Sequence, residues 1–410
     1  MSQSVSVRLY ADVVHGYSRG VLRGVAEYAK IHGWWDFSFR SRIEPDFTSA
    51  LKRDGVRGVI IQIRQAEQAQ ELIDAGVAAV NVSHMADPLA LPAVFPDDLA
   101  AGQMAAEYFL DRGFRSFAFV GFASLHYSLL RARGFIDRIR VAGFDCPTFL
   151  RSPETLETGG VEEPEKADYT DALNDLPRPL AIFCCNDTCA RQIVQAAVRL
   201  GLQVPDEIAV LGVDNDEINC ELSGVPLSSV QLNTEQIGYH AASMLARLIA
   251  GQPAPAAPMF IAPVQVITRR STDVLALVDA EVSAAVRFIR DRGGREINVE
   301  DLLQRTSLSR RSLEMRFRKA LGRSPYQEIR RVQMERAKLL LSHTDRSVRE
   351  VADACGFKET RQLSTVFHDR VGVTPRQYRR RSRRNSQEFT DSQVDEPVDA
   401  QPAETESVKE

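Results

Sequence analysis

Residues 356–378 read GFKETRQLSTVFHDRVGVTPRQY, and residues 307–329 read SLSRRSLEMRFRKALGRSPYQEI. The two stretches share a pattern, because Phe317 and Gly322 of the earlier stretch lie fifty residues before Phe367 and Gly372 of the later one. The likeness continues upstream of both stretches, with a shift of one residue. One chain therefore carries the same unit twice.

Each unit predicts two helices joined by a short turn. The predicted first helices span 299–305 and 348–355, and the predicted second helices span 309–321 and 359–371. This arrangement is typical of a helix-turn-helix, whose second helix is free to enter the major groove of DNA. The whole segment from 271 to 384 is thus expected to be an all-α domain with two helix-turn-helix motifs.

The outward side chains of the second helices are our candidates for contacts with base edges. Arginine suits guanine, glutamine suits adenine, glutamate suits the amino group of cytosine, and threonine suits the methyl group of thymine. The candidates are Arg310, Arg311, Glu314, Thr360, Arg361, Gln362 and Thr365. Arg379 and Arg380, which follow the last helix, are expected to contact phosphates without regard to sequence.

The segment 324–347 between the units predicts a spacer helix of about fifteen residues. Two reading helices on one rigid spacer address successive faces of the major groove, about 34 Å apart. A repeated helical module of this kind could instead pack against a protein partner. Charge favours DNA: residues 287–384 contain 26 Lys and Arg against 12 Asp and Glu, a net charge of +14, whereas the rest of the chain carries −18.

Four short motifs stand out in residues 280–382: AKLLL at the end of the spacer, VADACGF and GVTPRQYRR in the second unit, and GRSP in the first. In these motifs the segment resembles the DNA-binding domain of AraC-family transcription regulators. The first unit departs from the family pattern, with Tyr326 after Ser-Pro and Ile329 where tyrosine is commoner. The departure concerns packing more than base reading.

The first two thirds of the chain alternate between apolar runs and helical stretches, which favours βα units in doubly wound parallel sheets. The predicted strands are VSVRLYA, RGVIIQI, VAAVNV, SFAFVGF, PLAIFCC and IAVLGVD. Two such lobes form a cleft, and ligands bind beyond the carboxyl ends of the strands. The candidate ligand-binding residues are Asp12, Tyr17, Arg19, Asp97, Arg131, Asn186 and Asp214.

These candidates are mostly carboxylates and amides near aromatic residues, which suits a neutral ligand rich in hydroxyl groups. A phosphate ligand would need a glycine-rich loop, which we do not find. An Asp after a strand, such as Asp98 or Asp187, is alternatively the N-cap of the next helix. The six cysteines lack metal-binding spacing, so we expect free thiols, no metal and no cofactor.

The sequence GYSRG at 16–20 fits the G-x-S-x-G pattern of a hydrolase nucleophile. A hydrolase of this kind needs a histidine downstream of an acid, and beyond His126 the histidines are His240, His343 and His368, which lie in a predicted helix or in the DNA-binding segment. We therefore expect no enzyme, and interpret GYSRG as a turn with Ser18 as a helix N-cap.

Residues 5–270 resemble the effector domain of LacI/GalR regulators and periplasmic sugar-binding proteins, most clearly in LGVDND and PLSSVQLNTEQIGYHAASML. The resemblance implies that Arg131 and Asp214 hold a sugar and that Asn186 is another contact. A sensor of this kind joined to an AraC-like reader resembles a known group of sugar-responsive regulators. This resemblance implies D-xylose or a related aldose as effector, a homodimer, and activation of genes for sugar catabolism. A different small ligand is the alternative, and contact with RNA polymerase is left open.

The expected organisation is a two-lobed sensor at 1–270, the reader at 271–384 and a disordered acidic tail at 385–410. The chain has no apolar run long enough to span a bilayer, and its N-terminus lacks the features of a signal peptide. We expect a cytoplasmic protein that binds double-stranded DNA and no membrane.

Overall fold

The computed structural model describes residues 5–33, 35–86, 91–151, 173, 176–255, 257–274, 279–292 and 297–380, so the expected tail lies outside the described residues. The chain forms two units, of which the first contains residues up to 287 together with 306–324, and the second contains 288–305 and the residues from 325 onward. Each unit is described by itself. No helix of the described part is long and apolar enough to cross a membrane.

The first lobe of the sensor is built on a parallel sheet with the strand order β2-β1-β3-β4. Its elements are β1 (Val5–Tyr10), α1 (Gly16–His32), β2 (Trp35–Arg40), α2 (Phe47–Arg53), β3 (Gly58–Ile61), α3 (Ala66–Ala75), β4 (Ala78–Asn81), β5 (Val94–Pro96), α9 (Thr234–Ile249) and β11 (Met259–Ile261). β5 and β11 form a separate parallel pair, which a bridge between Asn81 and Ala93 connects to β4.

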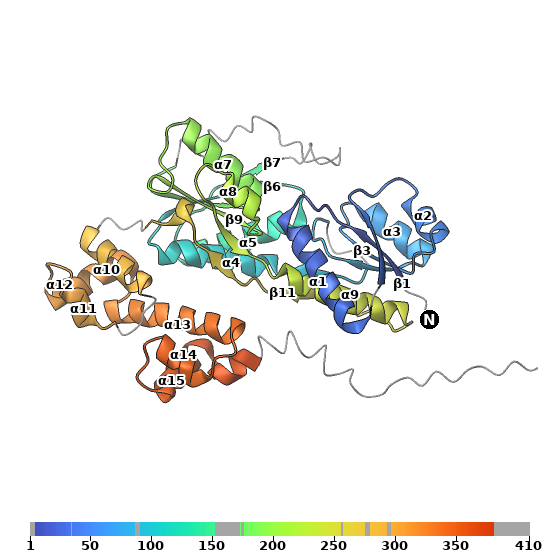
Figure 1. Cartoon of the computed structure of the whole chain (residues 1–410). Helices are drawn as coiled ribbons and strands as arrows, with labels where there is room; N and C mark the ends of the chain where they lie inside the picture. Colours follow the sequence, from blue (N-terminus) through green and yellow to red (C-terminus); the bar gives the residue numbers. More distant parts are fainter. Residues whose placement is uncertain are drawn as a thin grey trace, which may run out of the picture. The chain divides into compact units, whose positions relative to one another are not determined.

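Alternate residues of these strands face opposite sides of the sheet, and helices cover both sides (Figure 1). Leu9 and Ile60 are buried against α1 and α9, whereas Tyr10, Val59 and Ile61 are buried against α2 and α3. Strands covered on both faces need nearly continuous apolar sequence, which is why these runs were recognisable.

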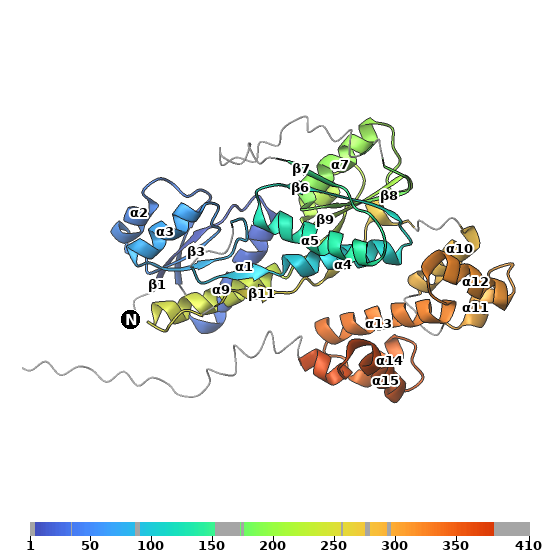
Figure 2. The same ribbon diagram turned by 180° about the vertical axis from the view of Figure 1, so that it is seen from behind.

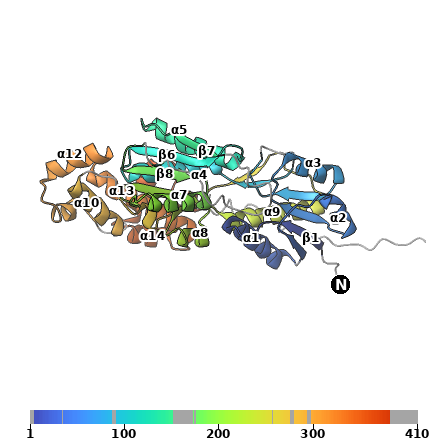
Figure 3. The same cartoon turned by 90° about the horizontal axis from the view of Figure 1, so that it is seen from above.

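The second lobe has a sheet of order β12-β10-β9-β8-β6-β7, parallel except for the β10–β12 pair. Its elements are α4 (Asp98–Asp111), β6 (Ser116–Phe122), α5 (His126–Val141), β7 (Thr148–Arg151), β8 (Leu180–Cys184), α7 (Asp187–Arg199), β9 (Ile208–Val213), α8 (Glu217–Glu221), β10 (Ser228–Gln231), β12 (Gln265–Ile267) and the 3-10 turn η1 (Arg270–Thr272). In Figure 3, α5 lies on one side of this sheet and α7 and α8 lie on the other. All six predicted strands are confirmed, and the doubly wound arrangement is found in both lobes.

Helices α4 and α5 pack backbone to backbone at two glycines. A Cβ atom on Gly102 would lie 2.2 Å from the carbonyl oxygen of Arg131, and one on Gly134 would lie 2.1 Å from the carbonyl oxygen of Leu99. Only glycine permits so close an approach. The contact sets the position of α5, which carries Arg131, against α4, which begins at Asp98.

The helices of the reader are α10 (Ala280–Asp291), α11 (Val299–Leu303), α12 (Arg310–Leu321), α13 (Pro325–His343), α14 (Val348–Ala354) and α15 (Thr360–Val371). The four helices of the two repeated units, α11, α12, α14 and α15, match the predicted boundaries to within two residues, whereas α10 was not predicted. The spacer helix α13 has 19 residues, somewhat more than expected. Gly322 and Gly372 end the two second helices with φ of 70° and 77°, a left-handed conformation that favours glycine and stops a helix.

The second helix-turn-helix has its own core, which lies among α13, α14 and α15. Figure 2 shows these three helices side by side. Residues from all three helices form this core: Met334, Ala337, Leu341, Val351, Ala352, Leu363 and Phe367. Ser347 caps α14 by accepting from the backbone N–H of Glu350, whose carboxylate accepts from the N–H of Ser347. Leu363 and Phe367, which lie four residues apart on α15, are fully buried, so the opposite side of α15 faces outward.

Candidate functional site

A pocket of about 190 Å³ lies between the two lobes of the sensor, at the carboxyl ends of the strands. Sites for drug-sized ligands usually occupy about 300–1,000 Å³, so this pocket suits a smaller molecule. The first lobe lines it with Asp12, His15, Tyr17, Ser18, Gln62, Arg64, Ser83, His84, Met85 and Pro96. The second lobe lines it with Phe122, Leu125, Tyr127, Arg131, Asn186, Thr188 and Asp214.

Arg131 is the centre of a buried charge network at the side of the second lobe. Its Nε donates to Asp98 Oδ1 at 2.8 Å, and its Nη2 lies 3.7 Å from Asp214 Oδ1. His84 Nδ1 lies within hydrogen-bond distance of Asp98 Oδ2, at 3.0 Å. The guanidinium therefore lies between two carboxylates, one buried beneath the pocket and one in its wall.

This network affects the pKa of Arg131 and of Asp214. Burial alone would lower the pKa of Arg131, but the Asp98 and Asp214 carboxylates outweigh burial and raise it, so Arg131 is a permanent cation. Burial raises the pKa of Asp214 to about 7, although the nearby Arg131 opposes the rise. Asp214 can thus change its protonation near neutral pH.

Asn186 and Tyr127 complete the wall of the second lobe. Asn186 accepts from the N–H of Cys189 and so caps α7, and its Nδ2 donates to the Tyr127 hydroxyl at 3.3 Å. The Tyr127 ring lies under the guanidinium of Arg131, with 4.8 Å between the guanidinium carbon and the ring centroid. The wall therefore combines an apolar ring with amide, carboxylate and guanidinium groups, which can hold a ligand that has both hydroxyl groups and C–H faces.

The first lobe supplies polar groups opposite this wall. The Tyr17 hydroxyl donates to the carbonyl of Val82 at 2.6 Å, and burial raises its pKa, so it remains a neutral phenol. Ser18 donates to Gln62 Oε1 at 3.1 Å. Asp12 Oδ2 lies 3.7 Å from His15 Nε2. The two lobes together surround the pocket with groups that donate and accept hydrogen bonds.

The structure brings five of the seven predicted ligand-binding residues to this pocket: Asp12, Tyr17, Arg131, Asn186 and Asp214. The other two have different surroundings. Asp97 caps α4 by accepting from the N–H of Ala100 at 2.9 Å. Arg19 contacts Asp216 at 3.2 Å and does not line the pocket.

The N-cap role left open for Asp98 and Asp187 belongs in each case to the preceding residue, and the prediction of Ser18 as an N-cap is wrong. Asp97 and Asn186 cap α4 and α7, whereas their neighbours Asp98 and Asp187 are buried in the second lobe. The helix α1 begins at Gly16, so Ser18 lies inside its first turn and is not its N-cap.

The prediction of ligand-binding residues did not include Gln62, Arg64 and His84, which also line the pocket. Gln62 and Arg64 follow β3, and His84 follows β4. The strand-end rule that identified Asp214 applies equally to these positions. No group of three His, Cys, Asp or Glu side chains in the described ranges is placed to hold a metal ion.

The candidate DNA-binding side chains lie on the outer faces of α12 and α15. Arg310, Arg311, Arg361, Gln362 and Thr365 are exposed, and Glu314 and Thr360 are half-buried. Arg310 and Glu314 lie 3.8 Å apart on α12. Their positions leave the polar edges of both helices accessible, as reading of base edges requires.

The two predicted phosphate contacts differ in their surroundings. Arg380 is exposed. Arg379 is half-buried and donates to the carbonyls of Leu341 and Arg346. It therefore connects the end of the chain's last described segment to the end of α13, and a phosphate would have to compete with these bonds.

Comparisons with known proteins follow the division of the chain. A periplasmic binding protein-like domain profile matches residues 106–272, and a helix-turn-helix domain profile matches residues 302–381. The xylose operon regulatory protein of Haemophilus influenzae is 30% identical over 371 residues, which cover 88% of this chain and 95% of that protein. The xylose operon regulatory protein of Escherichia coli K12 is 30% identical over 386 residues, which cover 91% and 96%.

Solved structures give the same result. The structure of a xylose-binding transcription activator superposes with a TM-score of 0.57 at 28% identity and covers 92% of this chain and 98% of that chain. A LacI-type regulator from Alkaliphilus metalliredigens, complexed with D-xylulofuranose, covers 66% of this chain with a TM-score of 0.53 at 20% identity, which shows a shared sensor fold. The predicted fold class is confirmed, and because the relatives are regulators, the prediction that the chain is not an enzyme is confirmed as well.

Proposed function

The chain belongs to the family of xylose operon regulatory proteins, and on this basis we propose that D-xylose or a closely related aldose is the effector that it senses. The chain is a transcription regulator with a sugar-binding sensor and a helix-turn-helix DNA-binding domain. The effector would bind in the pocket between the lobes, with Asp214, Arg131 and Asn186 as its contacts on the second lobe.

The observation that supports this proposal is the pairing of Arg131 and Asp214 in the wall of a small pocket. A cation and a carboxylate 3.7 Å apart present donors and an acceptor side by side. Adjacent hydroxyl groups of a sugar both donate and accept, so they match such a pair. The ring of Tyr127 offers the flat apolar surface that a pyranose needs.

Binding can be tested with a thermal-shift panel of pentoses and hexoses on the full-length protein. A ligand that binds only the folded state stabilises it by about 2.7 kcal/mol at a hundredfold excess over its Kd. We expect a shift with D-xylose that is lost in Asp214→Asn. Asparagine is a suitable replacement because Asp214 has a φ of 104°, and asparagine tolerates positive φ better than most residues. A shift with other ligands only would favour the alternative, an AraC-type regulator with a different effector.

The effect of the sugar on transcription would follow from a two-state sensor. Sugar stabilises the arrangement in which the lobes are closed, and closure changes how the two reading segments of a homodimer engage adjacent sites. A coupling of about 1–3 kcal/mol changes DNA affinity about 5- to 150-fold. Equal DNA affinity with and without saturating sugar would contradict this part of the proposal and leave a changed contact with RNA polymerase as the route to activation.

The same proposal includes the domain bounds, the oligomeric state and the cellular location. We place the sensor at 1–270 and the reader at 271–384, in a cytoplasmic homodimer that activates genes for sugar catabolism. Sedimentation of the purified protein with and without operator DNA would test the dimer. In the reader, Arg310, Arg361 and Gln362 would contact base edges, and Arg380 would contact phosphate.

A further inference from the structure

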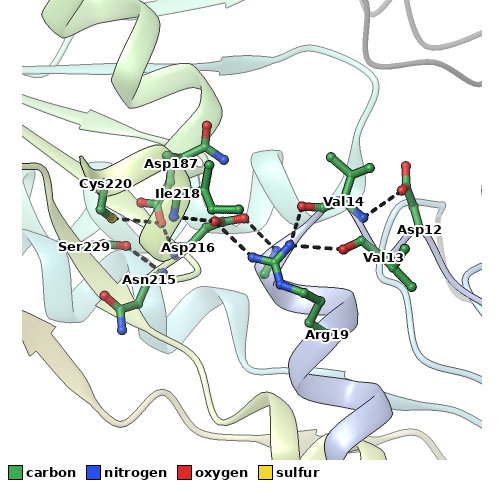
Figure 4. Close-up of polar contacts among 12 residues, drawn as sticks. Asp12, Val13, Val14, Arg19, Asp187, Asn215, Asp216, Ile218, Cys220 and Ser229 are labelled. Carbon is green, nitrogen blue, oxygen red and sulfur yellow. Dashed lines mark hydrogen bonds and ion pairs between the residues drawn. The ribbon is translucent and has the colours of Figure 1, made fainter. Parts of the chain in front are cut away.

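A cluster of polar contacts joins the two lobes outside the pocket (Figure 4). Its centre is Asp216, the N-cap of α8 in the second lobe, whose side chain is 5% exposed. Asp216 Oδ2 accepts from the backbone N–H of Gly16 at 2.6 Å, and Asp216 Oδ1 accepts from Arg19 Nη2 at 3.2 Å. Gly16 and Arg19 both belong to α1 of the first lobe, so one carboxylate makes two bonds across the cleft.

Asp216 is held in place by contacts within its own lobe. Its N–H donates to Asp187 Oδ2 at 2.8 Å, and its Oδ1 accepts from the N–H of Ile218 at 3.1 Å. Burial raises the pKa of Asp187 well above the usual range, which favours the neutral form of Asp187 beside Asp216. The Asp216 carboxylate is thus prepositioned before the first lobe reaches it.

Arg19 is likewise held by its own lobe, through bonds to the carbonyls of Val13 and Val14. Gly16 provides room for the contact, because a Cβ atom there would lie 3.0 Å from atoms of the Asp216 side chain. Each partner is therefore fixed by contacts that do not depend on the other lobe. The contact between them forms only when the lobes lie together.

The turn that carries Asp216 also carries Asp214 of the pocket. Asp214 and Asn215 have φ values of 104° and 51°, and this left-handed pair directs the chain so that Asp214 lines the pocket and Asp216 meets α1. Asn215 fixes the turn through its N–H, which donates to Ser229 at 2.9 Å, and through its Oδ1, which accepts from Arg269 at 2.8 Å. Asp214, which would contact a ligand, and Asp216, which contacts α1, are therefore two residues apart in one rigid turn.

We propose that the Arg19–Asp216 ion pair is a latch that stabilises the closed arrangement of the lobes and thereby determines the affinity of the sensor for its effector. Neither residue lines the pocket, so both act as positioning residues. A ligand held between two lobes binds only to the closed fraction of the protein, and its apparent Kd is the intrinsic Kd divided by that fraction. The latch increases the fraction of the protein that is closed, and it therefore lowers the apparent Kd. The identity of the effector in this proposal rests on the proposed function, but the effect of the latch on closure does not.

The test uses the full-length protein with Arg19→Gln, Asp216→Asn and the double variant. Arg23→Gln is the matched control, because Arg23 lies on the same helix and its partner Glu235, at 3.7 Å, belongs to α9 of the same lobe. Asparagine at 216 keeps the N-cap of α8 while it removes the charge. A purely structural role of either residue within its own lobe would make the effects of the two single variants additive.

The first measurement is made without any sugar. Spin labels at positions 53 and 199, which are exposed on α2 and α7, report the distance between the lobes in a Cys146→Ser background, since the other cysteines are buried. We expect the distance distribution of Arg19→Gln and Asp216→Asn to shift toward longer values, and that of Arg23→Gln to match the parent protein. If the distance distributions of both single variants match that of the parent protein, the latch proposal is wrong.

The second measurement is the Kd of D-xylose by titration calorimetry. We expect Kd to rise at least about fivefold in each single variant, which corresponds to about 1 kcal/mol, and no further in the double variant. A Kd unchanged in both single variants, or strictly additive changes, would also overturn the latch. If the parent protein itself fails to bind D-xylose, the proposed function is wrong about the effector, and the distance measurement still decides the latch.

Discussion

The charged side chains of the sensor pocket and those of the reading helices differ in how much they contribute to the fold. Arg131 of the pocket and Asp98 beneath it have side chains that are 4% and 0% exposed and are bonded to each other. On α12, Arg310 and Glu314 are 60% and 42% exposed. A buried charge depends on its partner for stability, whereas an exposed charge is already solvated by water. The difference implies that ligand recognition and folding are coupled in the sensor and separate in the reader.

The strongest test of this comparison is Arg131→Met, which leaves Asp98 buried without its cation. Loss of one partner of a buried ion pair costs about 3–5 kcal/mol. We expect the free energy of unfolding, measured by urea denaturation, to fall by about that amount and sugar binding to be lost. The control is Arg133→Met on the same helix, since Arg133 is 71% exposed and lies 3.8 Å from Asp137. A similar loss in both variants would remove the distinction between buried and exposed charges.

The matching test in the reader is Arg361→Ala, with Gln362→Ala as a second variant. A good contact to a base edge contributes about 1–3 kcal/mol of discrimination, so affinity for the operator should fall by a corresponding factor while competitor DNA binds nearly as before. The free energy of unfolding should stay within about 0.5 kcal/mol of the parent. Arg370→Ala, also exposed on α15, serves as control in the same binding assay. Unchanged operator affinity in both test variants would place the reading surface elsewhere.

The smallest of these effects concerns pH. The pKa of Asp214 is about 7 in the folded protein, so its carboxylate is mostly protonated at pH 6 and mostly ionised at pH 8. If sugar hydroxyls donate to the carboxylate, sugar affinity should rise over this interval by up to about tenfold, as the ionised fraction does for a pKa near 7. His15 and His84 also line the pocket, so the change must persist in His15→Gln and His84→Gln to be assigned to Asp214.

Stability should respond to pH in the opposite direction. The folded-state pKa of Asp214 is raised above its ordinary value of 3.8, so the folded protein binds the proton more tightly than the unfolded chain. The stabilising contribution is fully present below pH 4 and is lost as pH rises toward 7. Asp187, whose pKa burial also raises, contributes with the same sign. Urea denaturation of Asp214→Asn should therefore show a weaker decline of stability with pH than the parent protein.

The parts of the fold that the sequence predicted are those with continuous apolar runs or repeated spacing. The strand β2 was not predicted, because it lies at the sheet edge and alternates Trp35, Phe37 and Phe39 with polar residues, and Phe39 is 53% exposed. An edge strand with one half-covered face has a weaker apolar signal than a central strand. The boundaries of the four helices in the two repeated units were predicted to within one or two residues, because repeated glycines and capping residues indicate them directly.

The sequence predicted the site residues that follow strands, but it did not predict the contact between the two lobes. Asp12, Asn186 and Asp214 follow strands, and parallel strands bring such positions to one edge. Arg19 satisfies the same local pattern, yet its partner Asp216 lies 197 residues away, and no local spacing indicates that the two will meet. Their contact depends on how the lobes are arranged, which only the structure provides.

The backbone contact between α4 and α5 has a consequence for redesign of the sensor. Gly102 and Gly134 leave no space for a side chain, so an alanine at either position would push apart the helices that carry Asp98 and Arg131. These glycines lie in neither the pocket nor the charge network, and a screen that varied only pocket residues would never sample them. An engineer who wants a regulator for another sugar should therefore keep residues 102 and 134 as glycine and vary Gln62 and Thr188, which line the pocket and lie on neither α4 nor α5.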